Sequence, residues 1–240
     1  MSRLTETMMN VVAVIFDMDG LLLDSERLAL AAFVETCDHF GLGDHTAVFM
    51  RCVGATHTLG EQILRDGLPG NVDHLAFGRL WDSTYVEHTS DSAIPLKSGA
   101  AELLQDLKGF GVPMAVATST STSRARQKLQ SCGIVQDFDV IVGGDQVQRS
   151  KPCPDIYLRA AELLHIQPER CLALEDSENG VRSAIGAGMK VIQIPDLVQP
   201  SAALRELGHT VLTTLHDVRE WYSRMRSADR APQPTDSGGG

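Results

Sequence analysis

The sequence predicts an α/β protein built on a doubly wound parallel sheet, with an all-helical domain inserted after the first strand. From residue 98 onward, apolar runs typical of buried strands alternate with helical patterns. Such alternation implies a parallel sheet covered by helices on both faces. Between residues 25 and 95 the patterns are helical only. The run VVAVIFD at 11–17 precedes this segment and is expected to join the same sheet.

Each element has its own signal. Gly109 and Gly111 close one helical pattern, and Pro154 stands near the start of another, as helix ends and starts favour. The expected strands cover 11–17, 113–119, 138–144, 170–176 and 189–195. The expected helices cover 25–41, 58–67, 72–88, 100–111, 122–132, 154–166 and 178–188, with weaker ones near 200–208 and 214–225.

The domain organisation follows from this order. Residues 1–23 and 96–226 are expected to form the α/β core, and residues 24–95 the inserted helical domain. The last stretch, 227–240, is rich in Pro, Gly and Ser, which predicts a flexible tail.

Composition narrows the function classes. A formal charge of −10 argues against a nucleic-acid partner, because phosphates on a duplex are neutralised by a basic face. The five cysteines are widely spaced without a C-x-x-C pair, which favours reduced thiols over disulfides or a zinc site. The sequence has no apolar run of about 18 residues to span a membrane and no signal-peptide pattern. We therefore expect a cytoplasmic protein.

Polar residues gather where the expected strands end. Ligands of doubly wound sheets bind at the carboxyl ends of the strands, near the switch in strand order. Residues suited to phosphate and metal chemistry follow four of these strands: Asp17 and Asp19, Thr118 and Ser119, Lys151, and Glu175 and Asp176. Any one of them could be a helix cap, a turn residue or a surface lysine. Their common position at one sheet edge favours a single site.

The carboxylates imply a cation. Two carboxylates about 4 Å apart repel by roughly 4 kcal/mol at an effective dielectric of about 20. A set of four at neighbouring strand ends would oppose folding unless it were protonated or neutralised. Oxygen ligands of this kind suit a hard cation, so we expect Mg²⁺.

Four motifs in order carry a family resemblance. DMDGLLLDS, ATS, SKPCPD and ALEDSENG resemble the four motifs of the haloacid dehalogenase superfamily, in its phosphatase and β-phosphoglucomutase-like branch. The resemblance spans roughly 10–23 and 96–220, and implies a Rossmann-like core with a helical cap at 24–95. The cap itself is matched only by position and helical character.

The resemblance also implies roles for these residues. Asp17 would be the nucleophile that forms an aspartyl-phosphate, and Asp19 the general acid and base. Thr118 and the Ser119 amide would hold the phosphate, while Lys151 would offset negative charge. Asp17, the Asp19 carbonyl, Glu175 and Asp176 would bind Mg²⁺. Gly20 would let the chain turn beside the substrate.

Differences between this sequence and other branches of the superfamily indicate which reaction to expect. Haloalkanoic acid dehalogenases lack an acid at the place of Asp19, and phosphonate hydrolases need a cap lysine, whereas the first lysine here is Lys97. Positions that match substrate contacts of the mutases are here Ala29, Val53, Ser121 and Thr122. These differences favour a phosphatase.

Cap contacts are harder to predict. Arg51, Thr56 and His57 lie in the stretch MRCVGATHT and are candidates for substrate binding, although a solvated arginine and a structural histidine are the commoner roles of such residues. Trp81 and Tyr85 lie at helical spacing and are expected in the cap core. Asp24, where the chain enters the cap, is expected at a hinge or helix cap.

These observations predict a Mg²⁺-dependent phosphatase for a small phosphorylated metabolite such as a sugar phosphate. Two alternatives stay open: a β-phosphoglucomutase-type mutase, and a non-catalytic module that binds phosphate or Mg²⁺ on an enzyme scaffold.

Overall fold

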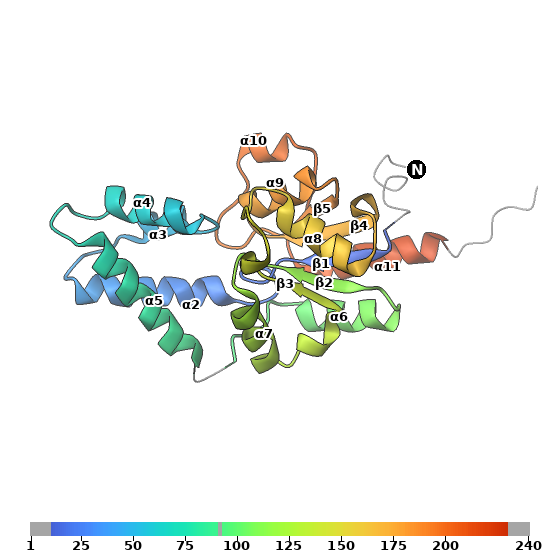
Figure 1. The fold of residues 1–240 in the computed structure, drawn as a ribbon, viewed down its shortest axis with the longest axis horizontal. Helices are drawn as coiled ribbons and strands as arrows, with labels where there is room; N and C mark the ends of the chain where they lie inside the picture. Colours follow the sequence, from blue (N-terminus) through green and yellow to red (C-terminus); the bar gives the residue numbers. More distant parts are fainter. Residues whose placement is uncertain (1–10, 91–92, 230–240) are drawn as a thin grey trace, which may run out of the picture.

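The computed structural model describes residues 11–90 and 93–229 (Figure 1). Six parallel strands form one sheet in the order β3-β2-β1-β4-β5-β6. The strand order switches sides at β1, whose neighbours are β2 on one side and β4 on the other. The strands are β1 Ala13–Phe16, β2 Met114–Ala117, β3 Val140–Val142, β4 Cys171–Glu175, β5 Lys190–Gln193 and β6 Thr210–Val211.

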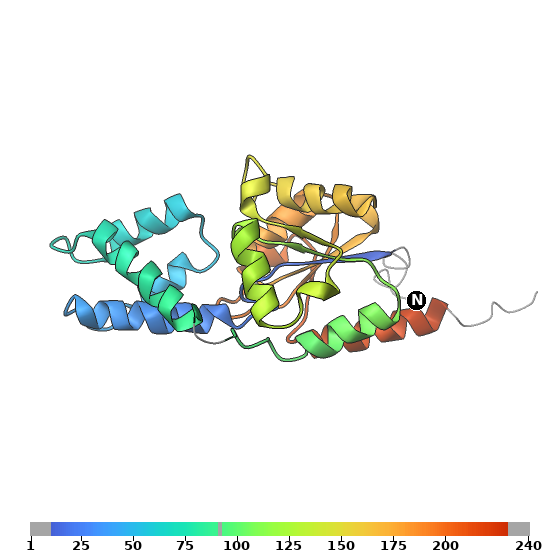
Figure 2. The ribbon, with the colours of Figure 1, turned by 60° about the horizontal axis from the view of Figure 1, so that its bottom comes forward.

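Helices cover both faces of the sheet because alternate strand residues point to opposite sides. Val14 and Phe16 of β1 face a cluster that includes α6, α7 and α11, whereas Ala13 and Ile15 face α8 and α9. Figure 2 shows α6 and α11 side by side along their face. The core helices are α6 Ala100–Gly109, α7 Thr122–Ser131, α8 Asp155–Leu164, α9 Glu178–Gly186, α10 Ala202–Arg205 and α11 Leu215–Asp229, with short 3-10 helices η1 Val135–Asp137, η2 Gly144–Gln146 and η3 Pro168–Arg170.

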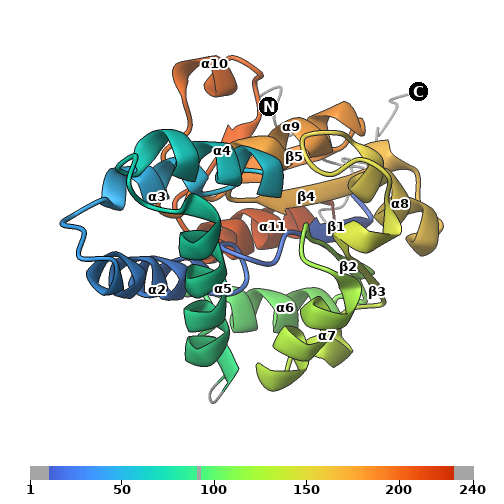
Figure 3. The same ribbon diagram turned by 60° about the vertical axis from the view of Figure 1, so that its left-hand side comes forward.

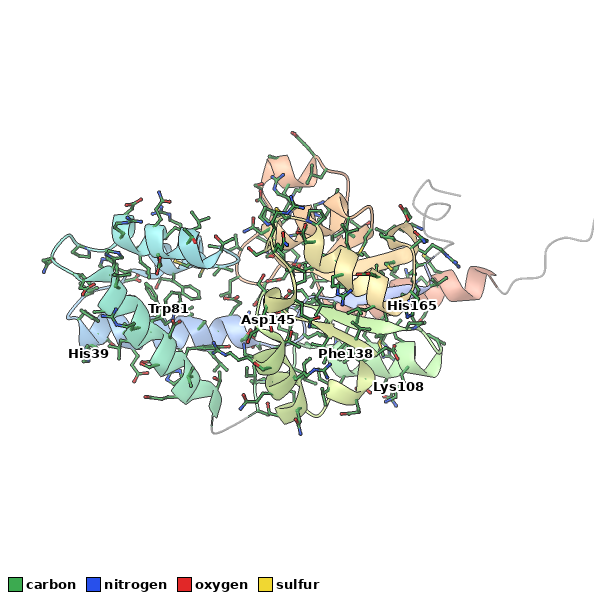
Figure 4. All side chains as sticks on the ribbon, in the orientation of Figure 1. His39, Trp81, Lys108, Phe138, Asp145 and His165 are labelled. Atoms are coloured by element: carbon green, nitrogen blue, oxygen red, sulfur yellow. The ribbon has the colours of Figure 1, made fainter. Side chains whose placement is uncertain are left out.

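The inserted segment folds into a helical domain beyond the carboxyl ends of the strands (Figures 1 and 3). Its core is aromatic: Phe33 contacts the rings of Phe49, Phe77 and Trp81 at centroid distances of 5.2–5.6 Å. Trp81 lies inside the domain in Figure 4. The helices of this cap are α2 Ser25–His39, α3 Thr46–Cys52, α4 His57–Gly67 and α5 His74–Ser90.

The two connections between cap and core run side by side. Leu23 pairs with Leu96 in an isolated antiparallel bridge, and the Asp24 N–H donates to the Pro95 carbonyl at 2.8 Å. Asp24 takes the N-cap position of α2, but its side chain makes no capping hydrogen bond and instead meets Arg27 and Lys97. The hinge prediction fits this position better than the capping one.

The predicted fold class is confirmed, with local differences. Helix α3 and strand β6 have no counterpart among the expected elements. Both are short, and a short element leaves too little periodicity for a sequence pattern. Helix α11 continues through Asp229, three residues into the segment expected as a tail; residues 230–240 lie outside the described part. Among the described residues, no helix is long and apolar enough to cross a membrane.

Candidate active site

The carboxyl ends of the strands and the facing cap enclose a cavity of about 430 Å³. The core side of this cavity carries the residues predicted from four separate motifs, which the parallel sheet brings to one edge: Asp17, Asp19, Thr118, Ser119, Lys151 and Asp176. The cap side is mostly apolar and includes Ala29, Phe49, Cys52, Val53, Ala55 and Trp81. The core side of the cavity is therefore polar, and the cap side that faces it is mostly apolar.

Lys151 joins two of the carboxylates. Its Nζ donates to Asp17 Oδ1 at 2.6 Å and also to Oε1 of Glu175. All three side chains are buried. Burial alone would lower the pKa of Lys151, but the charges of Asp17 and Glu175 raise it, so the ammonium stays charged.

Glu175 is held from several sides. Tyr157 Oη donates to Oε1 at 2.7 Å, and Oε2 accepts the Asp176 and Ser177 amides at 3.1 and 3.2 Å. A Cβ at Gly180 would stand 1.8 Å from Oε1 of Glu175, so α9 can pass over this carboxylate only with glycine there. Glu175 therefore enters the site with both oxygens already partnered, and does not line the cavity itself.

Asp17, Glu175 and Asp176 offer carboxylate oxygens within 4.8 Å of one another. Burial raises the pKa of Asp17 to about 8, against the opposing Lys151 charge, and burial followed by the Asp17 charge raises that of Asp176 well above its usual value. One ammonium is insufficient to offset these carboxylates. A buried, all-oxygen, negatively charged group fits a hard divalent cation such as Mg²⁺.

Asp19 points to a different set of partners. Its Oδ1 accepts from Lys128 Nζ at 2.7 Å and its Oδ2 from Thr120 Oγ1 at 2.8 Å. Burial would raise the pKa of Asp19, but the Lys128 charge and these hydrogen bonds lower it below the ordinary value. Asp19 is thus ionised while Asp17 favours the proton, although only one residue separates them.

Backbone geometry supports the predicted turn. Gly20 has φ +86°, and a Cβ there would come within 2.4 Å of Asp176 Oδ2. Both the conformation and the space require glycine. On the neighbouring strand end, Thr118 is buried and its Oγ1 accepts the Thr120 N–H at 3.2 Å, while Ser119 is exposed to the cavity.

The three cap residues predicted as candidate substrate contacts lie in different places. Thr56 lines the cavity, and its Oγ1 also accepts the Leu59 N–H as the N-cap of α4. Arg51 is exposed and lines a smaller neighbouring hollow of about 230 Å³ with Asp176 and Asp196. His57 is the first residue of α4, and its side chain lies outside the described part.

The two aromatic residues of α5 also differ from each other. Trp81 packs in the cap core as expected, and it lines the cavity as well. Tyr85 does not join that cluster: its hydroxyl lies 3.1 Å from Lys128 Nζ, across the boundary between cap and core. The expectation that Tyr85 belongs to the cap core was wrong, because helical spacing identifies a face but not its neighbour.

Sequence reasoning missed four residues. Lys128 and Tyr157 donate hydrogen bonds to the Asp19 and Glu175 carboxylates through contacts 109 and 18 residues apart in sequence, which no local pattern reveals. Gly180 is the last residue of the fourth motif, and its place in ALEDSENG was the available signal. Glu26 lines the cavity, and burial, with Asp19 and Asp196 nearby, raises its pKa to about 7. The acidic stretch DSE at 24–26 was visible but had no distinguishing partner.

Comparison with known proteins identifies the family of this chain. A family model described as haloacid dehalogenase-like hydrolase matches residues 14–194. "Protein CbbY" of Cereibacter sphaeroides is 34% identical over 194 residues, covering 77% of this chain and 84% of the relative. The "Phosphorylated carbohydrates phosphatase" of Thermotoga maritima is 31% identical over 207 residues, covering 86% and 95%.

A solved structure shows the same architecture. A HAD family hydrolase from Deinococcus radiodurans R1, with bound phosphate and sodium, superposes with a TM-score of 0.76 at 28% identity and covers 90% of this chain and 97% of its own. The span of the family model, residues 14–194, contains all four motifs, strands β2 to β5 and the inserted helices. The chain belongs to the haloacid dehalogenase-like hydrolases.

Proposed function

We propose that this protein is a Mg²⁺-dependent phosphatase that hydrolyses a small phosphomonoester, such as a sugar phosphate, through a phosphorylated Asp17. The observation that carries the proposal is the arrangement of Asp17 at one cavity with Lys151 at 2.6 Å and Asp19 at the same strand end. The relatives named as phosphatases support the same reaction class.

The residues suit two successive displacements. The Asp17 carboxylate attacks phosphorus, the bond from phosphorus to the ester oxygen breaks, and the leaving oxygen takes a proton through Asp19, whose otherwise ionised carboxylate first binds that proton from solvent. Water then attacks the aspartyl-phosphate while Asp19 takes its proton, which releases phosphate and restores Asp17. Lys151, Thr118 and the Ser119 amide are placed to offset charge on the phosphoryl oxygens.

Asp17, Asp176 and the Asp19 carbonyl would hold the metal, and Glu175, whose oxygens already accept hydrogen bonds, would add its negative charge to the site. When bound, Mg²⁺ would supply positive charge to the phosphoryl group and to the nucleophile. The raised pKa values of Asp17 and Asp176 support this assignment, because burial, and for Asp176 also the neighbouring Asp17 charge, disfavours ionised carboxylates that a bound cation would stabilise.

The cavity favours a substrate with one phosphate. Among the described residues that line it, Lys151 is the cationic side chain, and it already serves two carboxylates. The cap contributes no lysine, and Arg51 lies in the neighbouring hollow. Glu26 adds an acidic group to the wall. A second phosphate would therefore lack a counterion, which also disfavours the mutase alternative, since a mutase must hold a sugar phosphate in two orientations.

The four positions that match substrate contacts of the mutases also favour a phosphatase over a mutase. Ala29 and Val53 line the cavity as apolar surface. Thr122 is turned to the core, where its N–H and Oγ1 bond Asp145 at 2.7 and 2.8 Å, and neither it nor Ser121 is among the lining residues. Asp145 is labelled in Figure 4.

A screen of phosphorylated metabolites for phosphate release, with Mg²⁺ and with EDTA, tests the proposal. We expect free phosphate only with the metal. Binding without turnover would favour the non-catalytic module. Conversion of β-glucose 1-phosphate to glucose 6-phosphate, faster than phosphate release when a bisphosphate primer is present, would favour the mutase.

A further inference from the structure

Lys128 stands between the cap and the candidate general acid. It lies on α7 of the core, and its Nζ donates to Asp19 Oδ1 at 2.7 Å and to the Tyr85 hydroxyl at 3.1 Å. The ammonium is also 5.3 Å from the centre of the Tyr85 ring, within the range of a cation–π contact. The Lys128 side chain is 14% exposed, so water competes weakly for these contacts.

Lys128 acts on Asp19 and does not border the substrate space. Neither Lys128 nor Tyr85 is among the residues that line the cavity, whereas Asp19 is. Lys128 and Thr120 occupy the two carboxylate oxygens of Asp19, one each. A carboxylate that accepts a hydrogen bond at each oxygen has a defined orientation. Of the two hydrogen bonds, the one from Lys128 is charge-assisted and therefore the stronger.

Tyr85 links the hydrogen bond between Lys128 and Asp19 to the position of the cap. Tyr85 belongs to α5 of the cap, and its bond to Lys128 crosses to the core. A second crossing bond joins Asn179 Nδ2 on α9 to the Gly54 carbonyl at 2.6 Å. Figure 3 places α5 toward α7 and α4 toward α9, so the two bonds hold different parts of the cap. Movement of α5 away from the core would take one hydrogen-bond partner and the ring from Lys128.

We propose that Lys128 is a positioning residue for Asp19, and that Tyr85 couples its action to the docked position of the cap. In this arrangement the Lys128 ammonium contacts Tyr85 of the cap and also orients the carboxylate of Asp19, the candidate acid. The reaction step assigned to Asp19 rests on the proposed function above, but the contact itself does not.

Steady-state kinetics of four single variants and one double variant test the proposal with a phosphomonoester substrate and Mg²⁺. Lys128→Met should lower kcat by ~10–100-fold, as expected for a misplaced acid, and should change KM little. Lys128→Arg keeps the charge and should recover part of the loss. Arg126→Met removes an exposed charge from the same helix and should leave both constants near wild type.

Tyr85→Phe keeps the ring and removes the hydroxyl. It should lower kcat by a smaller factor, ~2–10-fold, and this loss should vanish in the Lys128→Met background, because the hydroxyl acts through the ammonium. The proposal is overturned if Lys128→Met resembles Arg126→Met, if it raises KM at constant kcat, or if Tyr85→Phe costs the same factor in both backgrounds.

A second measurement separates this inference from the proposed function. Thermal unfolding of Lys128→Met, Asp19→Asn and the double variant measures their coupling without any turnover. Non-additive shifts in Tm are expected, and additive shifts would overturn the contact even in an active enzyme. Wild-type protein that releases no phosphate from any substrate would instead reject the phosphatase proposal, and leave the coupling to be decided by unfolding.

Discussion

Lys151 Nζ lies 2.6 Å from Asp17 Oδ1 and bonds Glu175 with the same ammonium, so one buried cation serves two buried carboxylates. These side chains come from three different motifs, spaced 134 and 24 residues apart. A substitution of Lys151 should therefore change two things at once: the stability of the folded protein and the charge around Asp17, the proposed nucleophile.

Removal of this ammonium should destabilise the fold. Lys151→Met leaves the carboxylates without their buried counterion, and loss of one partner of a buried pair costs ~3–5 kcal/mol. Lys108→Met is the matched control, because Lys108 pairs with Asp137 at 2.6 Å with its side chain 59% exposed (Figure 4). Such an exposed pair contributes ~0–1 kcal/mol. Urea unfolding without metal measures both, and equal losses would contradict the assignment.

The two aspartates of the first motif should be separable. Asp17→Asn should lower turnover by ~10³-fold or more and prevent phosphorylation of the enzyme, since an amide is a poor nucleophile. Asp19→Asn should lower turnover by ~10²–10⁴-fold while metal and phosphate still bind. Mass spectrometry of acid-quenched enzyme locates the phosphoryl group, and a phosphorylated residue other than Asp17 would refute the roles.

Stability without metal should fall as pH rises through neutrality. The folded-state pKa of Asp17 is raised to about 8 and that of Glu26 to about 7, so the folded protein binds these protons more tightly than the unfolded chain. Its stability therefore declines as pH climbs toward these values. The lowered pKa of Asp19 acts only in acid, below its ordinary value of 3.8, and has no effect in this range.

Mg²⁺ should reverse this trend, because it binds the ionised carboxylates that protons otherwise occupy. We expect a lower Tm at about pH 8.5 than at about pH 7 in EDTA, and a larger gain in Tm from Mg²⁺ at the higher pH. Asp176→Asn should reduce that gain and raise the Mg²⁺ concentration needed for activity. A Tm in EDTA that increases between these two pH values would contradict the prediction.

Two glycines in helices should respond oppositely to alanine. Gly180→Ala places a Cβ 1.8 Å from the Glu175 carboxylate, so α9 or Glu175 must shift, and both stability and turnover should fall. Gly60→Ala on α4 meets no atom within 4 Å and should be neutral or stabilise by ~0.5–1 kcal/mol through helix propensity. Thermal unfolding compares them. A Gly180→Ala protein as stable as Gly60→Ala would mean that Glu175 is not held as described.

The local signals in the sequence were sufficient for the sheet, most helices and the residues at the strand ends. Continuous apolar runs and Gly or Pro boundaries are encoded over a few neighbouring residues, so β1, β2, β4 and β5 lie inside their expected ranges. Parallel strands then bring Asp17, Thr118, Lys151 and Asp176 to one edge as a consequence of topology. Short elements such as α3 and β6 escaped detection for lack of periodicity.

Tertiary structure alone decided which partner each charged group has. Asp17 and Asp19 look equivalent in DMDG, yet one is bound by Lys151 and the other by Lys128, and their pKa values move in opposite directions. Tyr85 shares the helical spacing of Trp81, yet contacts the core instead of the cap interior. The Tyr85 contact depends on how α5 and α7 meet across the domain boundary, and the two lysine contacts depend on how the sheet and its helices assemble. Desolvation and Coulomb energies act between side chains that are close in space, whatever their separation along the chain.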